Sequence, residues 1–130
     1  MTLAWYFEDE KTAASIVVLN HVAEEGAVVP ALWHLEVLNG LQVAVRRGRI
    51  TAGYRDASLD DLGALVIAID LETTRQAWVA TLSLCERSGL TAYDAAYLEL
   101  AVRCRLPLAT LDGELVRAAK AENVPLVGVT

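Results

Sequence analysis

The sequence predicts an α/β sandwich with a mainly parallel sheet. Short apolar runs alternate with helical segments along the whole chain, which is the pattern of βα units. Hydrophobic residues make up 55% of the chain and charged residues 22%, so an intrinsically disordered protein is excluded. A chain of 130 residues is long enough to bury its own core and too short for two ordinary domains. We therefore expect one domain over residues 1–130.

Helices are indicated by apolar residues at helical spacing and by residues that begin or end a helix. Val18 and Val22 lie one turn apart in the first such segment, and Gly26 ends it. The predicted helices cover residues 11–25, 31–47, 51–62, 73–87, 91–103 and 113–122.

Four short apolar runs between these helices predict strands. The β-branched residues of the second run favour a strand over a helix. The predicted strands cover residues 27–30, 66–71, 106–111 and 125–129. In parallel sheets, ligands bind at the carboxyl ends of the strands, so acidic residues placed there are candidates for a functional site.

Aromatic residues fall into two groups. Trp33 and Trp78 lie on apolar helix faces, which predicts that both belong to the core. Trp5, Tyr6 and Phe7 are interpreted as packing or dimer-surface residues rather than base-stacking ones.

Composition limits the class of protein. The net charge of −6, from 17 acidic and 11 basic residues, argues against tight sequence-independent binding of nucleic acid, where a basic face supplies most of the affinity. Bound cations would neutralise carboxylates and attract phosphate, which reverses that argument. Cys85 and Cys104 form no metal-binding or disulfide pattern, and neither a signal peptide nor an apolar run of about 20 residues is present. We expect a cytoplasmic protein.

Three acidic residues stand in apolar surroundings. Taken singly, each has a structural interpretation: Glu36 would bond Asn39, Asp94 would complete a capping box with Thr91, and Asp112 would cap a helix. Taken together, they follow strand ends or begin helices at one edge of the predicted sheet. Converging carboxylates repel one another unless they share a cation, and oxygen ligands suit Mg²⁺ or Mn²⁺.

These motifs resemble the PIN-domain family, and in particular the VapC-type ribonuclease toxins of toxin–antitoxin pairs. The resemblance covers nearly the whole chain, and the stretch that begins with Leu90-Thr91-Ala92-Tyr93-Asp94 is its most specific part. The matching segments are 3–10, 35–41 with Pro30, 90–101 and 108–115.

The resemblance implies a three-layer α/β/α sandwich and metal-dependent hydrolysis of RNA with Mg²⁺ or Mn²⁺. It also implies a homodimer and a cognate antitoxin protein as inhibitor, as in a type II toxin–antitoxin system. Carried over by motif, Glu36, Asp94 and Asp112 are the catalytic metal ligands, Thr110 orients a ligand or a water through its hydroxyl, and Asn39 supports Glu36.

The chain departs from the family at its beginning. The family's first strand ends in an aspartate, and neither has a counterpart before Met1, so we expect an N-terminally shortened chain without that strand. Glu8, Asp9 and Glu10 are poor substitutes, because they lie at the far end of the first helical turns. The alternative function is a catalytically inactive PIN-fold binding module that dimerises and binds an antitoxin-like partner.

Basic residues gather at two predicted helix ends. Arg46, Arg47 and Arg49 are candidates for RNA contact, and Arg103 and Arg105 are weaker ones. The simpler interpretation is a solvated helix end, where cations complement the helix dipole.

Overall fold

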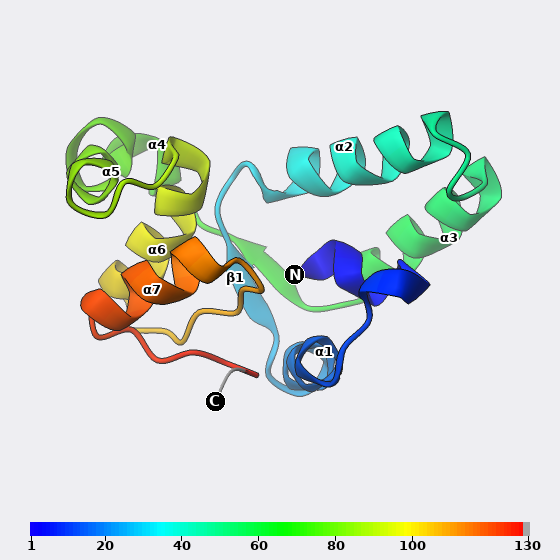
Figure 1. The fold of residues 1–130 in the computed structure, drawn as a ribbon, viewed down its shortest axis with the longest axis horizontal. Coiled ribbons are helices and arrows are strands. Elements are labelled where there is room, and N and C mark those ends of the chain that lie inside the picture. Colours follow the sequence, from blue (N-terminus) through cyan, green and yellow to red (C-terminus); the bar gives the residue numbers. More distant parts are fainter. Residues whose placement is uncertain (129–130) are drawn as a thin grey trace. The chain divides into compact units, whose positions relative to one another are not determined.

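The computed structural model describes residues 1–128 and divides into two compact units (Figure 1). The first unit comprises Met1–Ala27 and Leu32–Ala68, and the second comprises Val28–Ala31 and the chain from Ile69 onward. Mixed α/β structure is confirmed, although helices dominate it.

The first unit is built from helices with side-chain caps. Thr12 Oγ1 accepts a hydrogen bond from Ser15 N at 3.1 Å, and Thr51 Oγ1 accepts one from Tyr54 N at 3.0 Å. Such caps satisfy amides that a helix leaves unpaired at its start. The elements are the 3₁₀ helices η1 (Thr2–Trp5) and η2 (Glu8–Glu10) and the helices α1 (Ala13–Glu25), α2 (Trp33–Arg46) and α3 (Ala52–Gly63). The three helices predicted for this part of the chain are confirmed.

Tryptophans anchor the core of the first unit. The Nε1 atom of Trp5 donates to the Ser15 carbonyl at 2.9 Å, and that of Trp33 donates to Thr2 Oγ1 at 3.1 Å. Both rings and Phe7 are buried. The predicted packing roles of Trp5, Phe7 and Trp33 are therefore confirmed.

The second unit holds the remaining helices of the described chain (Figure 1). Thr91 Oγ1 accepts from Asp94 N at 3.2 Å, and Asp112 Oδ1 accepts from Glu114 N at 2.9 Å, so both predicted helix starts are confirmed. The elements are α4 (Thr73–Gln76), the π-helical turn η3 (Ala77–Thr81), α5 (Leu82–Ser88), α6 (Ala92–Cys104) and α7 (Gly113–Ala121).

The predicted core position of Trp78 is wrong, because this side chain is 90% exposed. The prediction for Trp78 assumed that residues 73–87 form a regular helix of 3.6 residues per turn. The π-helical turn η3 interrupts that helix and widens it, so the apolar face is not continuous through Trp78.

The strands are shorter than predicted. β1 (Ala27–Val29) and β2 (Ile67–Ile69) form a two-stranded parallel sheet. The strands predicted over 106–111 and 125–129 are reduced to one parallel bridge between Leu108 and Leu126, and Val129 lies outside the described residues. Pro107 and Pro125 lack the amide hydrogen that a longer ladder needs.

One apolar cluster forms the core of the second unit. Helix α6 packs against η3, α5 and α7, and Leu98 at its centre is fully buried. The cluster consists of Leu84, Leu90, Ala95, Leu98, Ala101, Leu108, Leu115, Ala118, Ala119 and Val124. This packing fixes the start of α6 beside the start of α7.

Leu98→Ala is expected to lower the free energy of unfolding by about 2–5 kcal/mol, because the lost methyl groups leave a cavity in a closed core. Urea unfolding followed by circular dichroism measures the change. Val102→Ala on the same helix is the control, since Val102 is 43% exposed and its truncation leaves no enclosed cavity. Equal losses in the two variants would contradict this account of the core.

Candidate functional site

Asp94 and Asp112 form an acidic pair in the second unit. Asp94 lies in the first turn of α6, and Asp112 is the N-cap of α7. Their side chains lie within hydrogen-bonding reach of each other. The structure therefore brings together two of the three acidic residues that the sequence analysis selected.

The surroundings of Asp94, including Asp112, raise its pKa. Burial raises the pKa of Asp94, and the charge and the hydrogen bond of Asp112 raise it further. A hydrogen bond with the Thr91 side chain works in the opposite direction and is outweighed. At neutral pH, ionising both carboxyl groups is therefore costly unless a cation joins them.

Hydroxyl and amide groups fix Asp112. Thr110 is buried, and its Oγ1 accepts a hydrogen bond from Asp112 N at 3.1 Å. One carboxylate oxygen of Asp112 caps α7 through Glu114 N, which leaves the other oxygen for Asp94 or a ligand. Thr110 thus holds the turn that presents Asp112.

Glu36 and Asn39 lie in the first unit, on exposed positions of α2. Their apolar neighbours Leu35 and Leu38 are 71% and 43% exposed. Burial lowers the pKa of the Met1 amino group, and the charges of Glu10 and Glu36 partly oppose that shift. Within residues 1–128, no group of three His, Cys, Asp or Glu side chains is arranged to hold a metal ion.

The basic residues at the end of α2 differ in their surroundings. Arg49 donates to Asp9 and to Glu10, each at 3.1 Å, and its guanidinium lies 4.5 Å from the ring centre of Phe7. Arg46 and Arg47 have exposed side chains. Acidic neighbours in the same unit therefore already bind the Arg49 cation.

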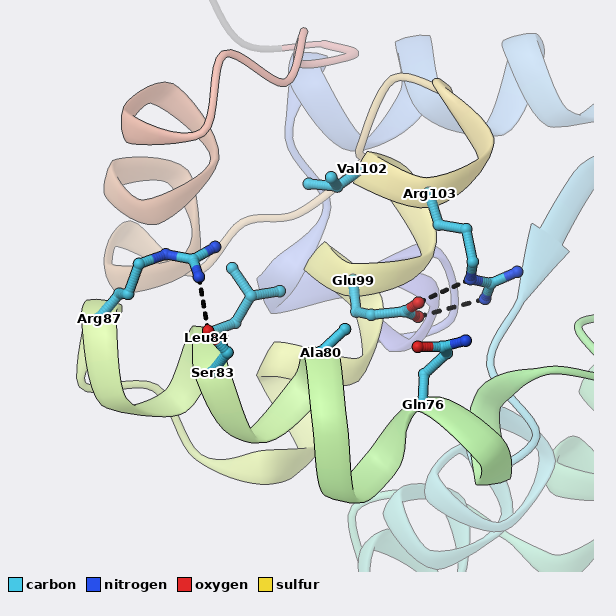
Figure 2. A pocket seen from close by; sticks show the side chains of 8 residues that line it. All are labelled: Gln76, Ala80, Ser83, Leu84, Arg87, Glu99, Val102 and Arg103. Atoms are coloured by element: carbon cyan, nitrogen blue, oxygen red, sulfur yellow. Dashed lines mark hydrogen bonds and ion pairs between the residues drawn. The ribbon is translucent and has the colours of Figure 1, made fainter.

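A triad of two buried carboxylates, Asp70 and Glu99, and the half-buried Arg103 was not predicted from the sequence. Arg103 Nη2 lies 2.6 Å from Asp70 Oδ2, and Arg103 Nε lies 2.6 Å from Glu99 Oε1. The two carboxylate side chains are 7% and 4% exposed. The Glu99–Arg103 part of the triad is drawn in Figure 2.

Arg103 is held by these two carboxylates. It is therefore neither a solvated residue at a helix end nor a cation free to bind phosphate. Burial raises the pKa of Asp70, but hydrogen bonds from Arg103, Thr73 and the Glu72 amide outweigh it and hold that pKa below its usual value. One sequence signal pointed to this contact: Glu99 lies one helical turn before Arg103.

A hollow of about 340 Å³ lies beside the triad, between α6 and the segment from α4 to α5 (Figure 2). It runs along the C-terminal half of α6, whereas Asp94 lies in the first turn of that helix. The hollow is therefore separate from the acidic pair. Its lining residues are Gln76, Ala80, Ser83, Leu84, Arg87, Glu99, Val102 and Arg103.

Comparison with models of known protein families and with curated protein sequences gives no match for this chain. Over the described residues, every helix is too short or too polar to cross a membrane.

Arg103→Ala is expected to lower the free energy of unfolding at pH 7 by about 3–5 kcal/mol, because it leaves two buried carboxylates without their cation. Urea unfolding measures the loss. Arg105→Ala is the matched control: its side chain is exposed, and a change below about 0.5 kcal/mol is expected. A similar loss in both variants would show that the triad adds nothing particular.

Asp94→Asn is expected to increase the free energy of unfolding at neutral pH. The raised pKa of Asp94 means that its protonated form favours folding, a contribution present below the unfolded pKa of about 3.9 and lost as pH rises through the folded pKa. Asparagine keeps the neutral form at every pH. Unfolding measured across a pH series should therefore show a gain at pH 7 that shrinks below about pH 4.

Asp70→Asn is expected to change the free energy of unfolding at pH 7 in the opposite direction. The folded pKa of Asp70 is lowered, so its contribution is present above the unfolded pKa of about 3.9 and is lost as pH falls through the folded pKa. This variant should be less stable than the wild type at pH 7. If both variants changed stability in the same direction at pH 7, the electrostatic assignment of at least one carboxylate would be wrong.

Proposed function

We propose that the chain is a PIN-type, metal-dependent endoribonuclease that hydrolyses RNA phosphodiester bonds and is the toxin of a type II toxin–antitoxin pair. The observation that carries the proposal is the acidic pair. Asp94 and Asp112 meet at the starts of two packed helices, and across residues 1–128 no Lys or Arg bonds to either carboxylate. These are also two of the three acidic residues that the family motifs select, the third being Glu36.

The donor set of the acidic pair fits a hard divalent cation. Mg²⁺ commonly binds through one or two carboxylates and keeps several waters, and Mn²⁺ accepts the same oxygen ligands. Binding of a cation between Asp94 and Asp112 would offset the repulsion that raises the pKa of Asp94. When bound, such a cation supplies an activated water and stabilises charge on a cleaved phosphodiester.

The surrounding residues have distinct roles in this proposal. Asp94 and Asp112 bind the cation, and Thr110 positions Asp112 by accepting its amide hydrogen. Glu36, with Asn39 in support, enters the proposal from its motif alone, since it lies on α2 of the first unit. The exposed Arg46 and Arg47 supply charge for RNA phosphates.

Partner binding is part of the same proposal. Leu35 and Leu71 are 71% and 88% exposed, and a partner that packed against them would remove apolar surface from water. A second copy of the chain and a cognate antitoxin are the proposed partners.

One observation favours the alternative of a PIN-fold binding module without catalysis. Over the described part of the chain, no third acidic group joins Asp94 and Asp112. With fewer charged ligands, a hard cation would be held more weakly.

Cleavage of a fluorophore–quencher RNA by the purified chain tests the proposal. We expect cleavage with Mn²⁺ and none with EDTA. Asp94→Asn and Asp112→Asn should each lower the rate about 100-fold or more, as removal of a charge-stabilising group does in other active sites. Asparagine caps helices as well as aspartate does, so Asp112→Asn should keep α7 intact.

Glu86→Gln is the control, because it removes an exposed acidic side chain of the same unit outside the acidic pair. It should cleave like the wild type. Undiminished cleavage in EDTA or by Asp94→Asn would refute the metal-dependent mechanism. A folded wild-type chain that does not cleave RNA with Mn²⁺ would contradict the nuclease and favour the binding module without catalysis.

A further inference from the structure

Large apolar side chains border the acidic pair on both of its segments. Tyr93 directly precedes Asp94 and is 67% exposed, and Leu111 directly precedes Asp112 and is 43% exposed. Consecutive Cα atoms lie about 3.8 Å apart. Asp94 and Asp112 lie at the starts of the packed helices α6 and α7 and within reach of each other, so both apolar side chains originate within one residue of the pair.

The exposure of Tyr93 follows from the length of α6. Tyr97 lies one turn further along the same helix face and packs against the core, and Leu100 and Ala101 below it are buried. Tyr93 continues this row beyond the end of the core. Its ring is therefore carried by a rigid helix while most of its surface faces solvent.

Charge alone gives the second unit little attraction for a nucleic-acid backbone. Most of its cations already bond carboxylates within the unit: Arg75 with Glu72, Arg87 with Glu122, Arg103 with Asp70 and Glu99, and Arg117 with Glu114. The whole chain carries a net charge of −6. An RNA held at the acidic pair therefore needs contacts other than phosphate pairing.

We propose that Tyr93, bordered by Leu111, is a base-stacking surface that holds an unpaired nucleobase next to the phosphodiester at the acidic pair. This inference rests on the proposed ribonuclease function and names a binding residue for its substrate. Aromatic rings are common platforms for the bases of single-stranded RNA, and stacking tolerates any base. A base inside a duplex is not available for this contact.

Steady-state cleavage of a single-stranded oligoribonucleotide with Mn²⁺ tests the role of Tyr93. Tyr93→Ala should lower kcat/KM about 5- to 150-fold, the range that loss of one base stack gives, with most of the change in KM. Tyr93→Phe keeps the ring and should stay within about twofold of the wild type. An unchanged kcat/KM in Tyr93→Ala would overturn the proposal.

A set of oligonucleotides, each with one abasic position, locates the stacked base. On the RNA that is abasic at that position, the kcat/KM of the wild type should fall by the same factor as the kcat/KM of Tyr93→Ala falls on intact RNA. The kcat/KM of Tyr93→Ala should not fall further on that abasic RNA. Trp78→Ala is the matched control, an exposed aromatic on η3 of the same unit, and should cleave like the wild type. Equal losses in Trp78→Ala and Tyr93→Ala, or losses on every abasic substrate, would overturn the assignment.

Fluorescence anisotropy with labelled single-stranded RNA separates this inference from the nuclease. If the wild type does not cleave but binds the RNA 5- to 150-fold more tightly than Tyr93→Ala, the stacking surface stands and the nuclease fails. If Asp94→Asn abolishes cleavage while Tyr93→Ala cleaves and binds normally, the nuclease stands and the stacking surface fails. Neither binding nor cleavage by the wild type would overturn both.

Discussion

The second unit depends on the neutralisation of carboxylates that are withdrawn from water. Asp70 comes from the segment after β2, and Glu99 comes from α6, yet both reach the guanidinium of Arg103. This contact links the chain after β2 to α6. It also offsets the cost of burying the two carboxylates. At the other end of α6, Asp94 meets Asp112 with no basic side chain from residues 1–128 bonded to either. Helix α6 thus contributes Glu99 to a pair of acids that Arg103 neutralises, and Asp94 to a pair that no basic side chain of residues 1–128 neutralises.

Local signals in the sequence were sufficient to predict where these helices begin. Thr12, Thr51, Thr91 and Asp112 each accept an amide hydrogen at a helix start, and the residues involved lie within three positions of one another. Strands depend on partners distant in the chain, so apolar composition indicated where they lie but not how long they are. Two proline-containing runs therefore paired at a single bridge rather than forming a ladder.

The candidate site was predictable only where the same local signals coincide with acidic residues, as at Asp94 and Asp112. The triad was missed because Asp70 and Arg103 are 33 residues apart, and only the folded chain shows that they meet. Trp78 was misplaced for a different reason. Helical spacing contains no sign that the backbone changes from an α-helical to a π-helical turn at Ala77.

The division of the chain into units has a consequence for biosynthesis, since neither unit is a continuous segment. Val28–Ala31 emerges from the ribosome well before Ile69, yet it supplies the carbonyl of Val29 for Asp70 N and the amide of Ala31 for Thr73 Oγ1. Those groups stay without their native partners while the intervening helices α2 and α3 are synthesised. A fragment that begins at Ile69 would lack them altogether. The second unit is therefore complete only when Val28–Ala31 is present together with the chain from Ile69, although the ribosome synthesises that segment much earlier.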